Sequence, residues 1–165
     1  MKKPYIMRIL SGGQTGVDRA ALDTALELGI PCGGWCPRGR RAEDGRIPAH
    51  YPLRELDCER YRDRTERNVL DADGTLILIR GVMDGGTALT ARWAARNSKP
   101  SIIIDLQHPP GTEIIYGWMA ENRIKVLNVA GPRESKQHGI YAQAKEFLLV
   151  VFCFIKKQTS VSRSL

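Results

Sequence analysis

Strand-like and helix-like segments alternate along this chain, and the alternation restricts its fold more than any other feature. Thr75 to Ile79 and Ser101 to Asp105 are continuous apolar, β-rich runs, which is typical of strands covered on both faces. Shorter runs of strand-forming residues lie at 6–10, 30–36 and 125–129. The pattern therefore predicts about five strands, with connections long enough to join them in parallel.

The segments between these strands have helical spacing. From Val17 to Leu28 apolar residues recur every three or four positions, and Gly29 follows as a stop signal. Strands joined by helices pair in parallel through right-handed crossovers, so the sequence predicts an α/β fold: a single three-layer, doubly wound, mostly parallel sheet. The predicted domain spans residues 1–155, and the basic segment 156–165 is expected to be a disordered tail. Further helices are expected around 61–70, 87–97, 113–122 and 135–152.

The net charge raises the question of a nucleic-acid partner. The chain of 165 residues, a length that fits one domain, has 25 Lys and Arg against 18 Asp and Glu, and its isoelectric point is about 9.5. Many of the arginines fall in two stretches, 38–46 and 60–67. A local anion site accounts for these stretches as well as a DNA-binding surface does, and aromatic residues are not interleaved with them at a stacking face. We therefore do not expect nucleic acid as a partner.

The cysteines and the apolar runs favour a cytoplasmic protein without a membrane segment. Cys32, Cys36, Cys58 and Cys153 form no disulfide framework, and the first pair lacks the neighbouring ligands of a zinc site, so no metal is expected. The longest apolar run, 147–155, has nine residues, far short of the roughly 20 that span a bilayer. It is still more apolar than one helix face buried on a single sheet requires, which favours a homo-oligomer.

The loops that leave the strand ends carry the candidate binding residues, because ligands of open parallel sheets bind beyond the carboxyl ends of the strands. The first loop is rich in glycine and hydroxyl side chains and leads into a helix N-terminus, a combination that suits a phosphate group. A tight, capped turn is the alternative interpretation. The candidate ligand-binding residues here are Ser11, Gly12, Gly13, Gln14, Thr15 and Gly16, followed on the helix by Asp18 and Arg19.

Three other loops supply further candidates for contact with a phosphorylated small molecule. One follows strand 75–79 with two glycines at a helix start, and one follows strand 125–129; a plain capped connection is the alternative for both. The third is an arginine-rich loop that either closes over an anionic ligand or lies on the surface in solvent. The candidates are Gly85, Gly86, Thr87 and Thr90 in the first, Gly131, Arg133 and Ser135 in the second, and Arg38, Gly39 and Arg40 in the third.

The same loops lack the features of the best-known nucleotide enzymes. Residues 12–16, GGQTG, have neither the glycine spacing of a dinucleotide-binding fingerprint nor the lysine of a Walker loop, which argues against NAD and against ATP hydrolysis. The acidic residues beside the loops, among them Asp18, Asp44 and Asp84, show no spacing that demands catalysis. We therefore assign no catalytic residue.

Six stretches of the chain, in order, resemble the bacterial family named putative molybdenum carrier proteins, also described as circularly permuted YpsA-like proteins. The resemblance covers most of the chain from residue 8 to about 150. This family is a branch of the Rossmann-like ligand-sensing (SLOG) superfamily that includes the lysine-decarboxylase-like LOG enzymes. The stretches are SGGQTGVDRAALD (11–23), GGWCPRGRRAEDGRIP (33–48), YPLRE (51–55), RTERNVLDADGTLIL (64–78), GGTALT (85–90) and NVAGPRES (128–135).

The resemblance implies a Rossmann-like fold and a pocket for a nucleotide-like or pterin-phosphate ligand, with loops 11–16 and 85–87 as binding elements. The family name implies binding or delivery of molybdenum cofactor, a phosphorylated pterin dithiolene, so the bound ligand is left open between that cofactor and a nucleotide. The signature of LOG enzymes is similar to Pro-Gly-Gly-x-Gly-Thr-x-x-Glu. In this chain Thr87 is followed by Ala88, Leu89 and Thr90, so the glutamate of that signature is absent from its expected position. The sequence therefore favours a binding or carrier protein, with a nucleotide-processing hydrolase (an N-glycosidase or phosphohydrolase) as the alternative.

Overall fold

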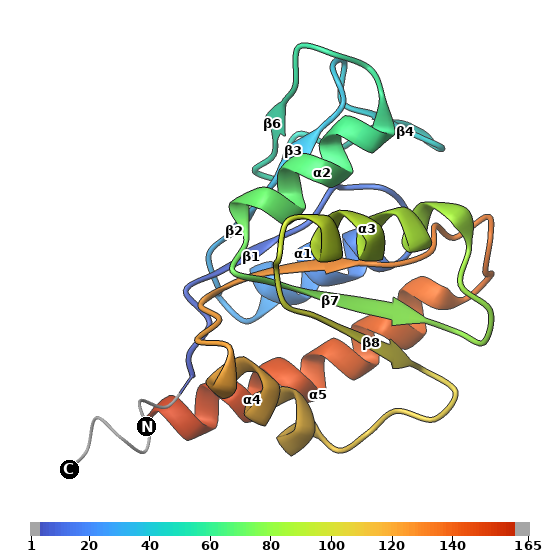
Figure 1. Ribbon diagram of the computed structural model, residues 1–165. Coiled ribbons are helices and arrows are strands. Elements are labelled where there is room, and N and C mark those ends of the chain that lie inside the picture. Colours follow the sequence, from blue (N-terminus) through green and yellow to red (C-terminus); the bar gives the residue numbers. More distant parts are fainter. Residues whose placement is uncertain (1–3, 161–165) are drawn as a thin grey trace.

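The computed structural model describes residues 4–160 and shows a central five-stranded sheet with helices on both faces (Figure 1). The strand order is β2-β1-β9-β7-β8, and every neighbouring pair is parallel. The predicted doubly wound, parallel, Rossmann-like α/β sheet is therefore confirmed. The strands are β1 (Arg8–Leu10), β2 (Cys32–Gly33), β7 (Gly74–Ile79), β8 (Ser101–Asp105) and β9 (Val126–Ala130).

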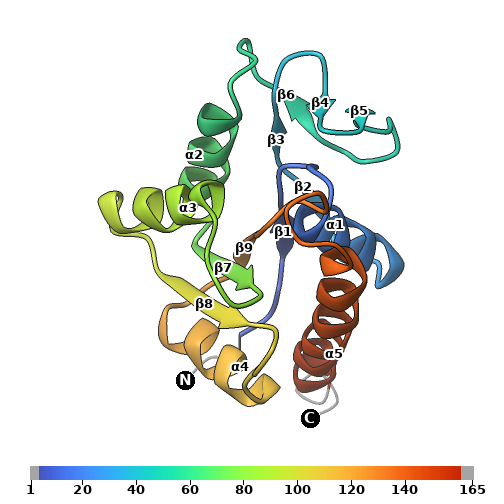
Figure 2. The ribbon, with the colours of Figure 1, turned by 90° about the vertical axis from the view of Figure 1, so that its right-hand side faces the viewer.

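Figure 2 shows the three layers of the fold. Helices α1, α4 and α5 cover one face of the sheet, where α5 packs against both of the others; α2 and α3 pack together on the opposite face. The chain thus leaves β1 toward one face and β7 toward the other, an arrangement that opens a crevice at the carboxyl edge of the sheet. The helices are α1 (Val17–Glu27), α2 (Tyr61–Asp71), α3 (Gly85–Arg96), α4 (Thr112–Glu121) and α5 (Ile140–Ser160).

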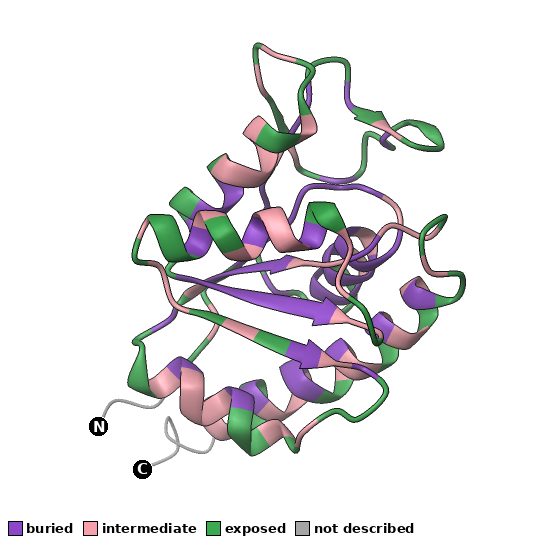
Figure 3. Cartoon of the chain, turned by 45° about the vertical axis from the view of Figure 1, so that its right-hand side comes forward, coloured by how far each residue is buried: buried purple, intermediate pink, exposed green. Residues whose placement is uncertain are grey.

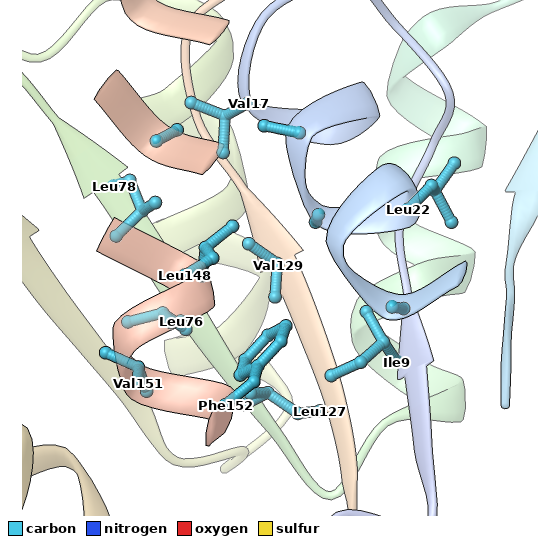
Figure 4. Close-up of a cluster of buried hydrophobic side chains, with 14 of the residues drawn as sticks. Ile9, Val17, Leu22, Leu76, Leu78, Leu127, Val129, Leu148, Val151 and Phe152 are labelled. Carbon is cyan, nitrogen blue, oxygen red and sulfur yellow. The ribbon is translucent and has the colours of Figure 1, made fainter. Parts of the chain in front are cut away.

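The main hydrophobic core lies between the sheet and α5 (Figure 4). Strand side chains alternate between the two faces, so Leu76 and Leu78 of β7 belong to this cluster while the equally buried Ile77 lies outside it. Residues at helical spacing on α5 fill the space opposite, namely Leu148, Val151, Phe152 and Ile155. Of the apolar run at 147–155, four residues are thus buried within one chain, four are half-buried and Val150 is exposed, and the homo-oligomer that the run favours stays a prediction.

Residues 35–56 follow β2 and form an arm that lies above α2 at the top of the view in Figure 1. Its first and last strands, β3 (Trp35–Cys36) and β6 (Arg54–Glu55), pair in parallel. Between them β4 (Arg41–Ala42) and β5 (Gly45–Arg46) form an antiparallel hairpin whose turn is Glu43–Asp44. The arginine-rich loop of the sequence is therefore partly ordered as a hairpin.

Strand β8 differs from the prediction of a strand covered on both faces. It lies at the edge of the sheet, and part of it is exposed (Figure 3). Ile103 in its centre is 45% exposed, whereas Ile104 is buried. An edge strand has a neighbour on one side only and is therefore less covered than a central strand such as β7. A continuous apolar run does not distinguish the two, because both positions can have the same composition.

The C-terminal helix also differs from the prediction. Helix α5 continues to Ser160, so a disordered tail from residue 156 is wrong for 156–160, and residues 161–165 lie outside the described part of the chain. Ile155 is buried in the core and the Lys156 ammonium donates a hydrogen bond to the Leu28 carbonyl oxygen at 2.6 Å, contacts that hold the last turns against α1.

Two structural features are absent from residues 4–160, a helix able to span a membrane and a cluster of metal-ligating side chains. No helix there is long and apolar enough to span a membrane. No group of three or more histidine, cysteine and acidic side chains in that range is arranged to hold a metal ion.

We predict that Phe152→Ala lowers the free energy of unfolding by about 3–5 kcal/mol, because it opens a cavity at one of the largest fully buried side chains. Val150→Ala, two residues earlier on the same helix but 58% exposed, is the matched control and should change stability by less than about 0.5 kcal/mol. Urea denaturation followed by circular dichroism measures both. Equal losses in the two variants would contradict the placement of α5.

Candidate functional site

A cavity of about 370 Å³ opens at the carboxyl edge of the sheet, between α2, α3 and the end of β9. This position agrees with the crevice expected where the chain leaves β1 and β7 toward opposite faces. We refer to it as the pocket. Its lining comes from the β1–α1 turn (Gly12, Gln14, Asp18), from α2 (Tyr61, Arg62, Arg64, Thr65, Asn68), from the start of α3 (Asp84, Gly85, Gly86, Thr87, Leu89, Thr90) and from β9 and the loop after it (Asn128, Val129, Ala130, Gly131, Arg133, Lys136).

A buried ion pair between Asp18 and Arg64 forms part of the pocket wall. An Arg64 guanidinium nitrogen lies 2.5 Å from an Asp18 carboxylate oxygen, and the two side chains are only 11% and 7% exposed. The same carboxylate oxygen accepts the backbone N–H of Gln14 at 3.2 Å. A Cβ at Gly12 would lie 1.4 Å from the Arg64 guanidinium, so only glycine lets this arginine lie across the β1–α1 turn.

The amide of Gln14 is held in one orientation. Its Oε1 accepts the backbone N–H groups of Thr15, at 3.0 Å, and of Glu43, at 2.9 Å. The reverse orientation would place an NH₂ group against two donors, so Nε2 is on the other side of the amide. Within the described residues this Nε2 is buried and has no hydrogen-bond partner.

Two more pocket residues have buried polar atoms without a partner among the described residues, Nε of Arg64 and Oγ1 of Thr87. Such atoms are rare in folded proteins because each costs about 1–3 kcal/mol. Together with Gln14 Nε2 they give the residues that line the pocket three buried groups that can donate a hydrogen bond. A ligand with several acceptor oxygens would satisfy them.

The N-terminus of α3 adds backbone donors to the same pocket. Asp84 caps the helix by accepting the backbone N–H of Thr87 at 2.7 Å. The N–H groups of Gly85 and Gly86 precede the first helical hydrogen bond, at the positive end of the helix dipole. An anion at this end is favoured by both effects.

The charged side chains of the pocket are mainly basic. Arg62, Arg64, Arg133 and Lys136 line it against two carboxylates, those of Asp18 and Asp84. The guanidinium carbons of Arg64 and Arg133 lie 5.9 Å and 5.7 Å from the centre of the Tyr61 ring. The excess of positive charge in a concave site favours an anionic ligand.

Comparison with known proteins identifies the family of this chain. Residues 9–152 match the model of the circularly permutated YpsA SLOG family. The chain belongs to this family. The resemblance stated from the sequence is confirmed.

A solved structure of a similar protein agrees with the family match. The chain is 48% identical to a Putative molybdenum carrier protein from Syntrophus aciditrophicus SB, known from a crystal structure at 1.45 Å resolution. The match covers 91% of this chain and 97% of the other, with a TM-score of 0.88. No match is found among the curated proteins.

The structure of this SLOG-family chain brings about half of the predicted binding residues to the pocket. Those that line it are Gly12, Gln14, Asp18, Gly85, Gly86, Thr87, Thr90, Gly131 and Arg133. Those that do not are Ser11, Gly13, Thr15, Gly16, Arg19, Arg38, Gly39, Arg40 and Ser135. The second group makes contacts within the chain instead: the Gly39 N–H, for example, donates to a Glu55 carboxylate oxygen at 2.8 Å, and the Gly13 carbonyl oxygen accepts from Arg19 Nε at 3.1 Å.

The N-terminus of α1, where the sequence places a phosphate, is closed by the chain itself. The Val17 N–H donates to the Pro132 carbonyl oxygen at 3.2 Å, and a Cβ at Gly16 would lie 2.4 Å from that same oxygen. Gly16 has φ of 78°, a conformation that favours glycine. Ser11 is fully buried and its hydroxyl donates to the Val129 carbonyl oxygen at 2.7 Å, so it links β1 to β9 rather than facing a ligand.

Thr15 and Ser135 bind a carboxylate of the chain. Both hydroxyls donate to the carboxylate of Glu43, which also accepts the Ser135 N–H at 3.1 Å and lies 3.9 Å from a guanidinium nitrogen of Arg133. Burial disfavours the charged form of Glu43, but the hydrogen bonds from Ser135 and Thr15 outweigh it and keep its pKa below the ordinary value. Glu43 thus occupies the position that an anionic ligand of these two hydroxyls would take.

The predicted site arginines outside the pocket, Arg38 and Arg40 of the arm and Arg19 of α1, also have partners within the chain. Arg40, with φ of 54° and 8% exposure, donates to the carbonyl oxygens of Ile47 and Tyr51 at 3.1 Å and 2.9 Å. Arg19 forms a two-point ion pair with Asp44 at 2.5 Å and 2.7 Å. Arg38 is exposed, 3.6 Å from a carboxylate oxygen of Glu59.

Sequence reasoning missed the contribution of α2. Tyr61, Arg64, Thr65 and Asn68 line the pocket, and their spacing of three and four residues puts them on one face of the helix. That spacing was available in the sequence as a polar and basic stripe. The arginines at 60–67 were compatible with a local anion site, but no α2 residue was named for it, because α2 follows no strand of the central sheet directly and the carboxyl-edge rule did not select it.

We predict that Arg64→Met lowers the free energy of unfolding by about 3–5 kcal/mol, because it leaves the buried Asp18 carboxylate without its charged partner. Arg67→Met on the same helix is the matched control. Arg67 and its partner Asp71 are 51% and 38% exposed, so this change should cost less than about 1 kcal/mol. Denaturant titration at neutral pH measures both, and a similar small loss in the two variants would show that the Asp18–Arg64 pair is not closed in solution.

Proposed function

We propose that this chain is a binding or carrier protein for a phosphorylated small molecule, nucleotide-like or a pterin of the molybdenum-cofactor class. The observation that carries the proposal is a set of buried polar atoms without a partner on three residues that line a basic pocket: Gln14 Nε2, Arg64 Nε and Thr87 Oγ1. Each of them can donate to a phosphate oxygen, and none has a partner among residues 4–160. A phosphate group satisfies several donors at once.

The dimensions of the pocket favour a molecule larger than a free phosphate ion. Its volume of about 370 Å³ lies in the range of small-molecule sites, roughly 300–1,000 Å³. Leu89, Val129 and Ala130 add apolar lining beside the polar wall. A phosphate attached to a heterocyclic body matches this combination of apolar and donor surfaces.

The carrier role and the molybdenum-containing ligand rest on the similar protein. That protein is named for carrying molybdenum, and it matches this chain over nearly the whole length of both. The molybdenum cofactor is a phosphorylated pterin. Its phosphate would contact the donors of Gln14, Arg64 and Thr87, and its ring system would occupy the rest of the pocket. A nucleotide presents the same phosphate chemistry, which keeps both ligands within the proposal.

The carboxylates that a hydrolase would use are engaged in contacts within the chain. Asp18 pairs with Arg64, Asp44 pairs with Arg19, and Asp84 caps α3. A general base needs a free acceptor directed at the attacking water. We therefore propose binding rather than hydrolysis.

Native mass spectrometry of gently purified protein, together with elemental analysis for molybdenum, tests this proposal. We expect a phosphorylated ligand in the wild-type protein, and we expect Gln14→Leu and Thr87→Val to weaken its retention by about tenfold each, since each removes one hydrogen bond to a charged group. Arg38→Ala, exposed and outside the pocket, should retain the ligand fully.

Two results would contradict the proposal. Equal retention in all three variants would place any ligand elsewhere on the protein. An empty wild-type protein that also binds no nucleoside monophosphate and no phosphorylated pterin at millimolar concentration would remove the proposed ligand class.

A further inference from the structure

We infer that Glu43, at the tip of the hairpin and outside the pocket lining, is a positioning residue for Gln14. It fixes the orientation of the Gln14 amide, so that Nε2 rather than Oε1 is available to a ligand. The inference rests on the proposed function for the identity of the ligand as an oxyanion. It goes beyond that function in assigning a role to the hairpin.

The first step is the anchoring of the Glu43 side chain. Two separate loops hold its carboxylate, one through the Thr15 hydroxyl and the other through the hydroxyl and N–H of Ser135. Only 17% of the side chain is exposed. Charge-assisted hydrogen bonds from several donors hold a carboxylate in a narrow range of positions, so the backbone of Glu43 is fixed with it.

The second step is the contact from the Glu43 backbone to Gln14. The Glu43 N–H donates to Gln14 Oε1 at 2.9 Å, next to the N–H of Thr15 at 3.0 Å. With two donors on Oε1, the amide cannot reverse without facing NH₂ toward N–H groups. If Glu43 moves away, one donor remains and both orientations of the amide become accessible.

The third step is the consequence for the ligand. In the observed orientation Nε2, a buried donor without a partner among the described residues, is the Gln14 atom left to donate a hydrogen bond to an oxyanion. In the reversed orientation it would contribute an acceptor, which repels an oxyanion. The hairpin thus determines whether Gln14 presents a hydrogen-bond donor or an acceptor, although no hairpin residue lines the pocket.

The neighbouring turn residue supports the same arrangement from the other side. Asp44 pairs with Arg19 through two hydrogen bonds, and Arg19 Nε donates to the Gly13 carbonyl oxygen at 3.1 Å. Both turn residues of the hairpin therefore hold the β1–α1 loop that carries Gln14. Glu59, by contrast, pairs with Arg41 of the hairpin at 3.0 Å without touching that loop.

The test is a double-mutant cycle on Glu43 and Gln14, with affinity for inorganic phosphate and for molybdate measured by isothermal titration calorimetry. Glu43→Ala should weaken binding about tenfold in the wild-type background and should have no further effect in the Gln14→Leu background, because it acts through Gln14. Glu59→Ala is the matched control and should leave affinity unchanged. Glu43→Gln, which keeps one acceptor oxygen, is expected to lose less affinity and serves if the alanine variant does not fold.

Equal losses from Glu43→Ala in both backgrounds, or unchanged affinity in the wild-type background, would overturn the inference. If the wild-type protein binds neither ion, the proposed function is decided by its own test with a nucleoside monophosphate and a phosphorylated pterin, and the ligand-free protein decides the inference separately. In ¹⁵N-correlated spectra the side-chain amide signals of Gln14, assigned with Gln14→Glu, should shift in Glu43→Ala and stay in place in Glu59→Ala. Unshifted signals in Glu43→Ala would overturn it.

Discussion

The buried ion pair between Asp18 and Arg64 is the contact on which the architecture of the site depends. Asp18 belongs to α1, on one face of the sheet, and Arg64 to α2, on the other. Their contact crosses the carboxyl edge of the sheet and joins the β1–α1 turn to the opposite helix layer. Because both charges are almost fully buried, neither is stable there without the other. The pair therefore fixes the distance between the two walls that enclose the pocket.

The glycines of the first loop serve this internal structure more than they serve a ligand. Gly12 makes room for the Arg64 guanidinium, and Gly16 for the Pro132 carbonyl group. The hydroxyls of Thr15 and Ser135 bind Glu43. In this chain the unpartnered donors lie instead on Gln14, Arg64 and Thr87 at the start of α3, residues that line the pocket beside α2 and α3.

Most of the fold was predictable from the sequence because alternating strands and helices permit few arrangements. The exposure of β8 was not, since an apolar strand at the edge of a sheet has the same composition as a central one. The site was predictable where it follows strand ends, as at Gly85 and Gly131, because parallel strands bring those loops together. It was not predictable at Arg64, whose place depends on a pairing between helices far apart in sequence. The arginines at 38–40 resembled an anion clamp, yet the left-handed backbone at Arg40 accompanies a side chain buried among carbonyl groups.

The central claim is that the pocket binds an oxyanion through the donors of Gln14, Arg64 and Thr87. Diffraction from crystals grown with molybdate, recorded near the molybdenum absorption edge, tests it most directly. The anomalous signal locates the ion without assumptions about its partners. We expect one peak in the pocket, within hydrogen-bonding distance of Gln14 Nε2 and Thr87 Oγ1, and its loss in crystals of Gln14→Leu. A peak confined to the exposed arginines of the arm, or no ordered peak in the pocket at saturating molybdate, would contradict the claim.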